Sequence, residues 1–553
     1  MSLVGLIEHL VQYADRVAES VLDGFSSPVR AWFETSFPEP TPPQQLGWPH
    51  IAAGRNSLIV SPTGSGKTLS AFLSGIDRLM TSPVPVREAR TRLLYISPLR
   101  ALAVDVEKNL RAPLRGITLA AERLGEEVHV PTVGMRTGDT PASERRQLVR
   151  NPPDLLITTP ESLYLMLTSA ARETLRNVEA VIIDEIHSVA ATKRGAHLSL
   201  TLERLERLVD RPVQRIGLSA TQRPLDEISR FLGGRDHVDG VHSWRPVEII
   251  DASAGPNIDL EVIVPVEDMA ELGKVSDTAE SDDPLNGAGP QRTSIWPSVH
   301  PRVLEQIQQH SSSIVFVNSR RLAERLAGRL NEIWDEQDAV SETESEPADG
   351  SDGRSEQFQR IRAHHGSLSK VRRLEIEDQL KRGEIRAIVA TSSLELGIDM
   401  GAVDLVVQVE SPGSVSRGLQ RVGRAGHQVG ARSVGKVFPK HRSDLLETAV
   451  VVDRMFQGDI EKTRYPRNPL DVLAQHIVAM TALEDWSFDD LLATVRSSAN
   501  FAELSDDVFE GVLDLLSGRY PSEEFSELRP RICLLYTSPS PRDQRGARMP
   551  SSA

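Results

Sequence analysis

Short apolar runs rich in β-branched residues alternate with amphipathic helical stretches along most of this chain. The runs are LLYIS (93–97), DLLITT (154–159), AVIID (180–184), PVQRIGLSA (212–220), SIVFV (313–317), EIRAIVAT (384–391) and DLVVQV (404–409). Strands that alternate with helices in this way are typical of parallel sheets covered by helices. The pattern therefore predicts an α/β fold with two parallel-sheet domains in tandem.

The spacing of these runs predicts a first domain over residues 1–245 and a second over 246–455. Residues 468–518 instead show helical periodicity, with candidate helix caps at Asn468, Ser487 and Ser505. A small, mainly helical domain is therefore expected over residues 456–531. The first twenty residues have no basic leader and are interpreted as an amphipathic helix rather than a secretory signal.

The acidic residues of the chain are unevenly placed. The formal net charge is −15, from 63 Lys and Arg against 78 Asp and Glu. Residues 267–283 hold seven acids and one base, and residues 335–353 hold eight acids and no base. Such segments cannot bury enough apolar surface to fold, so we expect solvated insertions near 267–297 and 335–356. The remaining chain is nearly neutral, which leaves a polyanionic partner possible.

Composition excludes two further classes of protein. The only cysteine, Cys533, allows neither an intrachain disulfide nor a cysteine-ligated zinc site, so a reducing, cytoplasmic setting is expected. No apolar run approaches the roughly 18 residues that a membrane-spanning helix needs. The last stretch, 532–553, turns abruptly to Ser, Pro and Arg. It is interpreted as a disordered or non-native tail.

A candidate phosphate loop follows the apolar run SLIV (57–60). The loop is SPTGSGKT (61–68), and it opens a helical stretch. Its glycines let backbone N–H groups surround phosphate oxygens, while Lys67 would reach the β- and γ-phosphates and Thr68 would ligate Mg²⁺. A glycine-rich turn that merely caps a helix would explain Gly64 and Gly66, but it leaves Lys67 without a purpose. The loop therefore predicts nucleotide binding by Thr63, Gly64, Ser65, Gly66, Lys67 and Thr68.

Two adjacent carboxylates follow the run AVIID. Asp184 and Glu185 are expected just past the carboxyl end of a strand, where open α/β sheets bind ligands. There Asp184 would hold Mg²⁺ through water, and Glu185 would orient and deprotonate the attacking water. A solvated helix cap with acids in its first turn is the alternative. The phosphate loop upstream favours the catalytic interpretation.

A second basic cluster occurs in the later domain, in the segment QRVGRAGH (420–427). Arg421 and Arg424 are spaced to share one helical face, which can be a solvated surface or can stabilise charge on a γ-phosphoryl group. The glycine-rich and serine-rich surroundings indicate close backbone packing, and they favour the second interpretation.

Taken in order, these segments resemble the superfamily-two helicases. The resemblance includes TPPQ (41–44), SPTGSGKT (61–68), SPLRAL (97–102), RTGDT (136–140), TTPESL (158–163), DEIH (184–187), SAT (219–221), ATSSLELGID (390–399) and QRVGRAGH (420–427). Within that superfamily DEIH, SSLELGID, QRVGRAGH and PRNPLDVLAQHIVAM resemble the Lhr (large helicase-related) family. The resemblance implies two RecA-like domains followed by a winged-helix-like domain.

The resemblance also implies roles for single residues. Gln44 would read the adenine edge with Phe37 near the base, and Asp399 would contact the ribose. Ser219 and Thr221 would couple the nucleotide site to the strand-binding face. Gln420 would meet the DEIH segment, and Arg421 and Arg424 would face the γ-phosphate. The chain departs from many relatives at His427, where they have arginine.

A nucleic-acid-binding face is implied by the same resemblance. Taken singly, each of its residues is better explained as a turn residue or a helix cap. Only the order of these residues along the chain favours a role in nucleic-acid binding. Such loops would position phosphates without reading bases. The residues are Arg100, Arg136, Thr137, Gly138, Thr159, Pro160, Arg320, His365, Gly366 and Thr391.

The implied activity is ATP-dependent and Mg²⁺-dependent translocation on single-stranded DNA, 3′ to 5′, with unwinding of DNA or RNA:DNA duplexes, in DNA repair and at the nucleoid. Relatives of this kind continue further, so the chain is expected to be a C-terminally truncated fragment. Two other functions stay open. An ATP-gated clamp would bind nucleic acid without separating strands, and a P-loop kinase would act on a small molecule.

Overall fold

The computed structural model consists of two compact units. It describes residues 21–62, 64–238, 241–253, 255, 257–269, 294–343, 359–395, 403–426, 432–519, 530–536 and 545–548. The first unit combines residues 1–253 with 462–553, and the second spans 254–461. The winged-helix region therefore belongs with the first sheet domain, which the linear order of the chain did not indicate.

A parallel sheet in the order β3-β4-β2-β5-β6-β1-β9 forms the centre of the first unit. The central strands are buried at every position because both faces of the sheet are covered by helices. Each run that predicted a strand in this unit contains one. The strands are β1 (Ser57–Val60), β2 (Leu93–Ile96), β3 (Val133–Arg136), β4 (Leu155–Thr158), β5 (Ala180–Ile183), β6 (Gln214–Ser219) and β9 (Glu248–Asp251).

Two helical layers cover this sheet. One face packs against α2 (Ser27–Ser36), α3 (Pro42–Ala52), α4 (Lys67–Thr81) and α5 (Arg100–Leu124). The other packs against α7 (Pro160–Leu167), η2 (Ala170–Leu175), α8 (His187–Ala190), α9 (Lys193–Val209) and α10 (Leu225–Gly233). The short helices η1 (Arg87–Ala89) and α6 (Ala142–Arg150) precede β2 and β4. This is a doubly wound α/β layer arrangement, as the sequence predicted.

A second parallel sheet has the order β10-β15-β14-β11-β13-β12. Its strands are β10 (Ile258–Val262), β11 (Ser313–Phe316), β12 (Ile361–His364), β13 (Ala387–Ala390), β14 (Leu405–Val409) and β15 (Ser433–Phe438). The helical elements are α11 (Trp296–Gln308), α12 (Arg320–Thr343), α13 (Lys370–Lys381), η4 (Ser392–Leu394), α14 (Val415–Val422) and α15 (Arg442–Gln457). The fold class of two parallel-sheet domains is confirmed.

The expected solvated insertions differ from the structure at their edges. Helix α12 continues to Thr343, so the second acidic window begins inside a helix. Met269 and Ile295 are buried in the core of the second unit, although both fall within the first insertion. Apolar residues at the edges of these windows pack even though the acids between them dominate the composition. Residues 270–293 and 344–358 lie outside the described residues.

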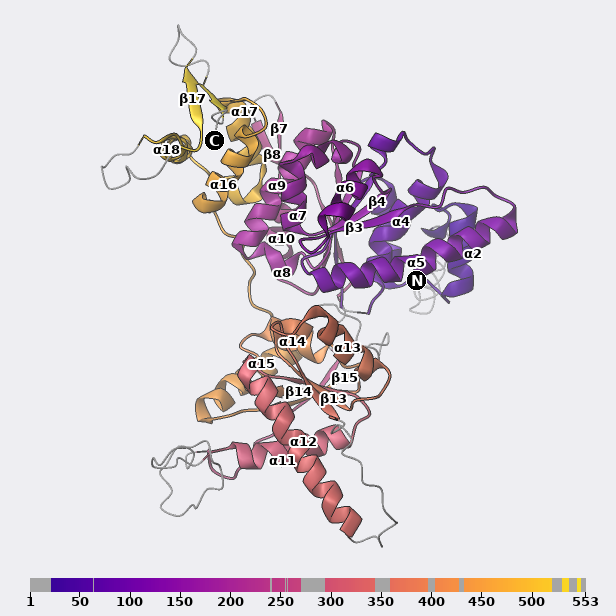
Figure 1. Ribbon diagram of the computed structural model, residues 1–553, viewed down its shortest axis with the longest axis vertical. Coiled ribbons are helices and arrows are strands. Elements are labelled where there is room, and N and C mark those ends of the chain that lie inside the picture. Colours follow the sequence, from indigo (N-terminus) through magenta and orange to yellow (C-terminus); the bar gives the residue numbers. More distant parts are fainter. Residues whose placement is uncertain are drawn as a thin grey trace, which may run out of the picture. The chain divides into compact units, whose positions relative to one another are not determined.

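The C-terminal region packs directly on the first unit, as Figure 1 shows for α16 and α17 beside α9. Its elements are α16 (Leu470–Thr481), β16 (Trp486–Ser487), α17 (Phe488–Ser497), η5 (Ala499–Phe501), α18 (Asp506–Ser517), β17 (Cys533–Tyr536) and β18 (Arg545–Arg548). Ala196 and Leu200 of α9 join Leu473 and Phe501 in one apolar cluster. The winged-helix region and the first sheet domain therefore share a core.

Two details of this region correct the sequence analysis. Ser487 and Ser505 cap their helices as expected, but Asn468 does not, because Pro469 is the residue that precedes α16. Strand β18 pairs with both β17 and β16, where a disordered tail was expected. The interpretation of the tail as non-native stays a prediction.

A buried ion cluster fastens a hairpin of β7 (Arg235–Val238) and β8 (Val241–Trp244) to the sheet. The buried guanidinium of Arg215 pairs with Glu203 at 2.8 Å and with Glu206 at 2.5 Å. Arg245, which follows β8, pairs with the same two carboxylates and with Asp236. Buried charges are tolerated when they are paired in this way. The cluster therefore ties β6, α9 and the hairpin together.

Two histidines at the boundary between α9 and α16, His197 and His476, should make the stability of the protein depend on pH. Burial lowers the pKa of His476 well below its usual value and that of His197 to about 4. Because both titrate near 6.5 in an unfolded chain, their contribution is present above about pH 6.5 and is lost as the pH falls towards 4. Between pH 7 and pH 5 the unfolding free energy of the parent should fall, because His476 must take up a proton when the chain unfolds. In His476→Gln this fall should be smaller by about 1–2 kcal/mol, as measured by urea unfolding at the two pH values. The partly exposed His50→Gln serves as control, and an unchanged pH profile in His476→Gln would contradict the prediction.

Candidate functional site

The phosphate loop connects the end of β1 to the start of α4. Gly64 and Gly66 have φ angles of 79° and 81°, in the left-handed region that favours glycine. A Cβ atom on Gly66 would lie 2.9 Å from Nε2 of Gln44. The glycines are therefore needed both for the turn and for the close approach of Gln44. Ser65 donates to the carbonyl of Pro62 at 2.8 Å, and Thr63 lies outside the described residues.

Lys67 stands at the first position of α4 with its ammonium group buried. Its Nζ lies 3.7 Å from Oε1 of Glu185, and both side chains are 7% exposed. Within the described part of the chain, no hydrogen-bond acceptor serves this Nζ. A buried ammonium group without acceptors is costly, and phosphate oxygens would satisfy it. The observed geometry therefore fits a bound nucleotide phosphate.

Asp184 and Glu185 follow β5 at the same edge of the sheet. The hydroxyl of Tyr95 donates to Oδ2 of Asp184, and the backbone N–H of Glu185 donates to Oδ1 at 2.9 Å. Burial, together with the charge of Glu185, raises the pKa of Asp184 to about 6. Lys67 acts in the opposite direction on this pKa. A divalent cation would favour the ionised carboxylate in the same way.

His187 connects these acids to the end of β6. The backbone N–H of Ala220 donates to its Nδ1 at 3.2 Å, and Oγ of Ser219 lies 3.4 Å from the same nitrogen. Burial lowers the pKa of His187, so the neutral ring accepts this hydrogen bond. Glu185 Oε2 lies 3.4 Å from Nδ1. Contacts thus run from Glu185 through His187 to Ser219, while the partly buried Thr221 follows without a described contact to them.

The residues expected at the adenine base lie beside the loop. Gln44 is buried, its Oε1 accepts from the N–H of Thr41 at 2.9 Å, and its Nε2 donates to the carbonyl of Gly66 at 3.4 Å. Phe37 is 40% exposed and packs against Phe33. The amide of Gln44 is thus held in the capping box of α3, while Phe37 offers an open ring.

The residues expected to contact nucleic acid in the first unit follow β2, β3 and β4, which are neighbours in the sheet. Arg100 forms an ion pair with Asp139 and packs against Gly138. The side chain of Arg136 is turned inward and buried, and this burial lowers its pKa. Thr137, Thr159 and Pro160 are also buried. The turn therefore offers Arg100 and the backbone around Gly138 rather than a row of exposed side chains.

In the second unit the corresponding residues follow β11, β12 and β13. Arg320 is exposed and donates to Oγ of Ser367 at 2.8 Å. The ring of His365 is buried and contacts Glu324 at 2.9 Å, while Gly366 is exposed. The N–H of Thr391 donates to the carbonyl of His364. The structure brings these three loops to one edge, although it turns the imidazole of His365 away from the surface.

The two arginines of α14 and the turn after it differ in their surroundings. Arg421 is buried against Phe316, pairs with Glu395, and donates to Gln408 at 2.8 Å and to Asn318 at 3.3 Å. These contacts hold the guanidinium group inside the second unit, and its expected approach to a γ-phosphate stays a prediction. Arg424 is buried, with its Nε 3.4 Å from the carbonyl of Gln420. Asp399 and His427 lie outside the described residues.

Two residues of this site were not singled out from the sequence. Tyr95 lies inside an apolar strand, where its hydroxyl gives no pattern of its own. Arg145 supports the turn after β3 by donating to the carbonyls of Gly138 and Thr140, at 2.7 Å and 2.8 Å. Polar groups within apolar runs are the signal that could have found Tyr95, since a buried hydroxyl needs a partner.

Three models of known protein families match successive parts of the chain. A DEAD/DEAH box helicase model matches residues 41–228, and a helicase conserved C-terminal domain model matches 299–428. The winged helix domain of large helicase-related protein matches 453–549. The Lhr helicase/probable uracil glycosylase of Mycolicibacterium smegmatis is 55% identical over 524 residues, which cover 92% of this chain. The chain belongs to the Lhr family.

Further matches support the assignment to the Lhr family. The ATP-dependent helicase Lhr-Core of Methanocaldococcus jannaschii is 38% identical and covers 93% of this chain. A solved structure of Mycobacterium smegmatis helicase Lhr bound to ssDNA and AMP-PNP matches 96% of this chain with a TM-score of 0.79 and 53% identity, and the match covers 61% of that chain. The chain spans 33% of the length of the first relative and 55% of the second.

Two other features are absent from the described residues. No described helix has the length and hydropathy that crossing a membrane requires. Among the same residues, no group of three or more His, Cys, Asp or Glu side chains is arranged to hold a metal ion. Mg²⁺ is commonly held by one or two carboxylates together with phosphate oxygens. Asp184 and the partly buried Thr68 meet that requirement only when a nucleotide supplies the rest.

The buried ammonium group of Lys67 makes a prediction about nucleotide binding. Lys67→Met keeps the length of the side chain but removes its charge, so phosphate oxygens lose a charge-assisted partner. We expect the affinity for a fluorescent ATP analogue to fall about tenfold or more in a fluorescence titration. Lys108→Met, at an exposed position of α5, is the matched control. Equal affinities for the two variants would contradict the assignment of Lys67.

Proposed function

We propose that this chain carries the motor of an ATP-dependent helicase, which couples ATP hydrolysis to movement along single-stranded DNA. The observation that carries the proposal is the convergence of Lys67, Asp184 and Glu185 at the carboxyl edge of the first sheet. Its support from relatives is the Lhr helicase structure bound to ssDNA and AMP-PNP. The chain covers 33% and 55% of the length of two Lhr relatives, so helicase activity of this chain is itself part of the proposal.

The carboxyl edge of the first sheet divides into two functional halves in this proposal. The ends of β1, β5 and β6 carry the phosphate loop, the two acids and Ser219, whereas the ends of β2, β3 and β4 carry Arg100 and the turn around Gly138. ATP occupies the first half and a nucleic-acid strand the second. One rigid sheet can thereby link the two ligands, because all these loops begin on neighbouring strands.

In the ATP half, the N–H groups of residues 64–68 and the ammonium group of Lys67 bind the phosphates, while Phe37 and Gln44 contact the base. Asp184 and Thr68 hold Mg²⁺, which neutralises charge that develops on the phosphates. Glu185 orients the attacking water and accepts its proton. The ammonium group of Lys67 lies 3.7 Å from Oε1 of Glu185 and places an opposite charge beside this carboxylate.

Coupling between the halves follows the contacts of His187. A change in the position of Glu185 on hydrolysis alters the hydrogen bond between His187 and the N–H of Ala220. That hydrogen bond sets the conformation of residues 219–221, which the resemblance assigns to coupling. In this proposal the roles of Gln420, Arg421, Arg424 and Asp399 stay predictions of that resemblance.

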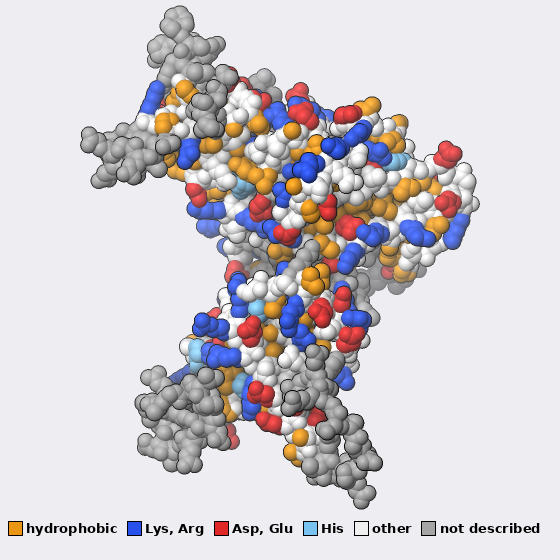
Figure 2. All heavy atoms as spheres, viewed as in Figure 1, with side chains coloured by type: hydrophobic (Ala, Val, Ile, Leu, Met, Phe, Trp, Pro, Cys, Tyr) orange, Lys and Arg blue, Asp and Glu red, His pale blue; other side chains and the backbone are white. Residues whose placement is uncertain are grey.

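The nucleic-acid half holds a strand by its phosphates. Figure 2 shows basic and acidic side chains interspersed over the face in view, without one broad basic field. Arg100, together with backbone N–H groups, then supplies contacts that position a strand without reading its bases. Arg320 would supply a contact of the same kind within the second unit. A 3′ to 5′ direction, unwinding of DNA or RNA:DNA duplexes and a role in DNA repair complete the proposal.

Replacing Glu185 tests the hydrolysis step. Glu185→Gln retains the shape of the side chain but cannot accept a proton, so we expect the ATP turnover number to fall by about 10²-fold or more while ATP binding persists. Steady-state phosphate release, measured with and without single-stranded DNA, is the assay. Glu122→Gln, at an exposed position of α5, is the control and should hydrolyse ATP at the parental rate. Retention of turnover in Glu185→Gln would refute its role as the base.

The alternative is an ATP-gated clamp, which shares the same nucleotide site. Labelled duplexes with a 3′ or a 5′ single-stranded tail separate the two proposals. A helicase releases the displaced strand in an ATP-dependent reaction, and preference for the 3′ tail supports the proposed direction. A clamp changes its affinity with ATP and releases no strand. DNA-stimulated hydrolysis without displacement would favour the clamp for this chain.

A further inference from the structure

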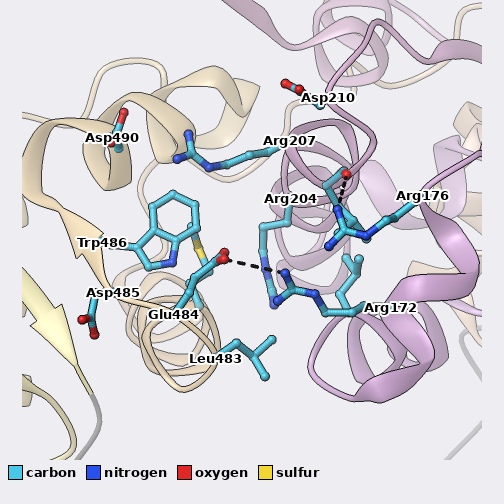
Figure 3. A pocket seen from close by; sticks show the side chains of 13 residues that line it. Arg172, Arg176, Arg204, Arg207, Asp210, Leu483, Glu484, Asp485, Trp486 and Asp490 are labelled. Carbon is cyan, nitrogen blue, oxygen red and sulfur yellow. Dashed lines mark hydrogen bonds and ion pairs between the residues drawn. The ribbon is translucent and has the colours of Figure 1, made fainter.

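A polar pocket lies between the first sheet domain and the winged-helix region. It has a volume of about 370 Å³. Figure 3 shows Arg172, Arg176, Arg204 and Arg207 from one side of the pocket facing Glu484 and Trp486 from the other. Both sides belong to the first compact unit.

The pocket lies at the edge of the sheet opposite the nucleotide. Arg172 and Arg176 precede β5, and Arg204 and Arg207 occupy the last turns of α9 before β6. These segments therefore approach the amino ends of the strands, whereas Lys67, Asp184 and Arg100 follow carboxyl ends. The pocket is separate from the places where ATP and a nucleic-acid strand are proposed to bind.

Arg204 is the central observation. It is 7% exposed, its guanidinium group lies 5.2 Å from the ring centre of Tyr164, and its Nη1 is 3.4 Å from Nδ1 of His476. Burial lowers the pKa of His476 well below its usual value, so this ring is neutral. Across the described ranges no carboxylate forms an ion pair with Arg204. A buried guanidinium group therefore borders a cavity without an ion-pair partner among the described residues.

Three further arginines and four acids line the pocket, and none of these acids forms an ion pair with Arg204 in the described part of the chain. Arg207 stacks on the ring of Trp486 at 4.2 Å and also has no ion pair within the described chain. Arg172 pairs with Glu173 at 3.4 Å and with Glu484 at 3.6 Å. The other three acids of the lining, Asp210, Asp485 and Asp490, lie at the rim in Figure 3.

Trp486 supplies a second unfilled requirement. Its Nε1 is buried, and no acceptor among the described residues reaches it. A buried indole N–H ordinarily has a hydrogen-bond partner. Arg204 thus lacks an ion-pair partner and the Trp486 N–H lacks an acceptor among the described residues, and an oxyanion would supply both.

We propose that this pocket binds a small phosphorylated anion, with Arg204 and Arg172 donating to its phosphoryl oxygens. Planar guanidinium groups match such oxygens with paired N–H donors. Glu484, half exposed in its ion pair with Arg172, is the internal counter-charge that the ligand displaces. Because Arg172 and Arg204 come from the sheet domain and Glu484 and Trp486 from the winged-helix region, the anion stabilises the contact between them.

Inorganic pyrophosphate is the first probe, titrated calorimetrically at constant ionic strength. The phosphate loop can also bind it, so the titrations use Lys67→Met protein. We expect one site, weakened about tenfold by Arg172→Gln through the loss of a charged hydrogen bond. Glu484→Gln removes the competing charge, so binding should tighten about threefold. Arg111→Gln, an exposed arginine of α5 paired with Glu107, is the matched control.

A titration with AMP distinguishes the two sources of the phosphoryl group. Tighter binding of AMP than of pyrophosphate identifies a nucleotide, and the reverse identifies an inorganic oligophosphate. Crystals soaked in tungstate, whose anomalous signal locates the ion, provide a readout that does not depend on the variants. Density beside Arg204 supports the proposal. Density confined to other places, or affinities that Arg172→Gln and Glu484→Gln change no more than Arg111→Gln does, overturns it.

Discussion

Burial of charge at the carboxyl edge of the first sheet is the constraint on which the site depends. Lys67, Asp184 and Glu185 are almost fully buried within one small region. Each charge is tolerated because another lies beside it: Lys67 faces Glu185, and Asp184 accepts from Tyr95 and from the backbone. Two carboxylates and one ammonium group still leave the site incomplete. The phosphate oxygens of a bound nucleotide would complete it.

The parallel sheet makes this arrangement possible. All strands of the first sheet point in the same direction, so the loops after β1, β5 and β6 meet at one edge. The strands themselves are held by apolar layers on both faces. Functional side chains therefore lie in the loops at the strand ends and not on the covered faces of the sheet. The same rule places Arg320, Gly366 and Thr391 at one edge of the second sheet.

The winged-helix region shows how a helix can serve two domains. Helix α9 presents one face to the first sheet and another to α16 and α17. Its buried polar groups follow the same division, because Glu203 pairs with Arg215 of the sheet whereas Arg204 contacts His476 of α16. The boundary between the two parts is therefore a shared core with charged groups inside it. Arg204, for which the described residues supply no ion pair, borders the arginine-lined pocket.

The sequence alone determined the elements whose signal is local. Apolar runs such as AVIID predicted buried strands, Ser487 and Ser505 predicted helix starts, and SPTGSGKT predicted a loop that curls around phosphate. These features depend on neighbouring residues, so no tertiary information was needed. The failure at Asn468 has a local cause as well, since Pro469 precedes the helix and takes the capping position.

Only the tertiary structure decided which distant groups share partners. It buried His365 against Glu324, enclosed Arg421 with Glu395, and joined residues 462–553 to the first sheet domain instead of the second. It also placed Tyr95 on Asp184 and Arg204 beside a cavity. Spacing along the chain carries no record of such contacts, because they arise where strands and helices far apart in sequence pack together.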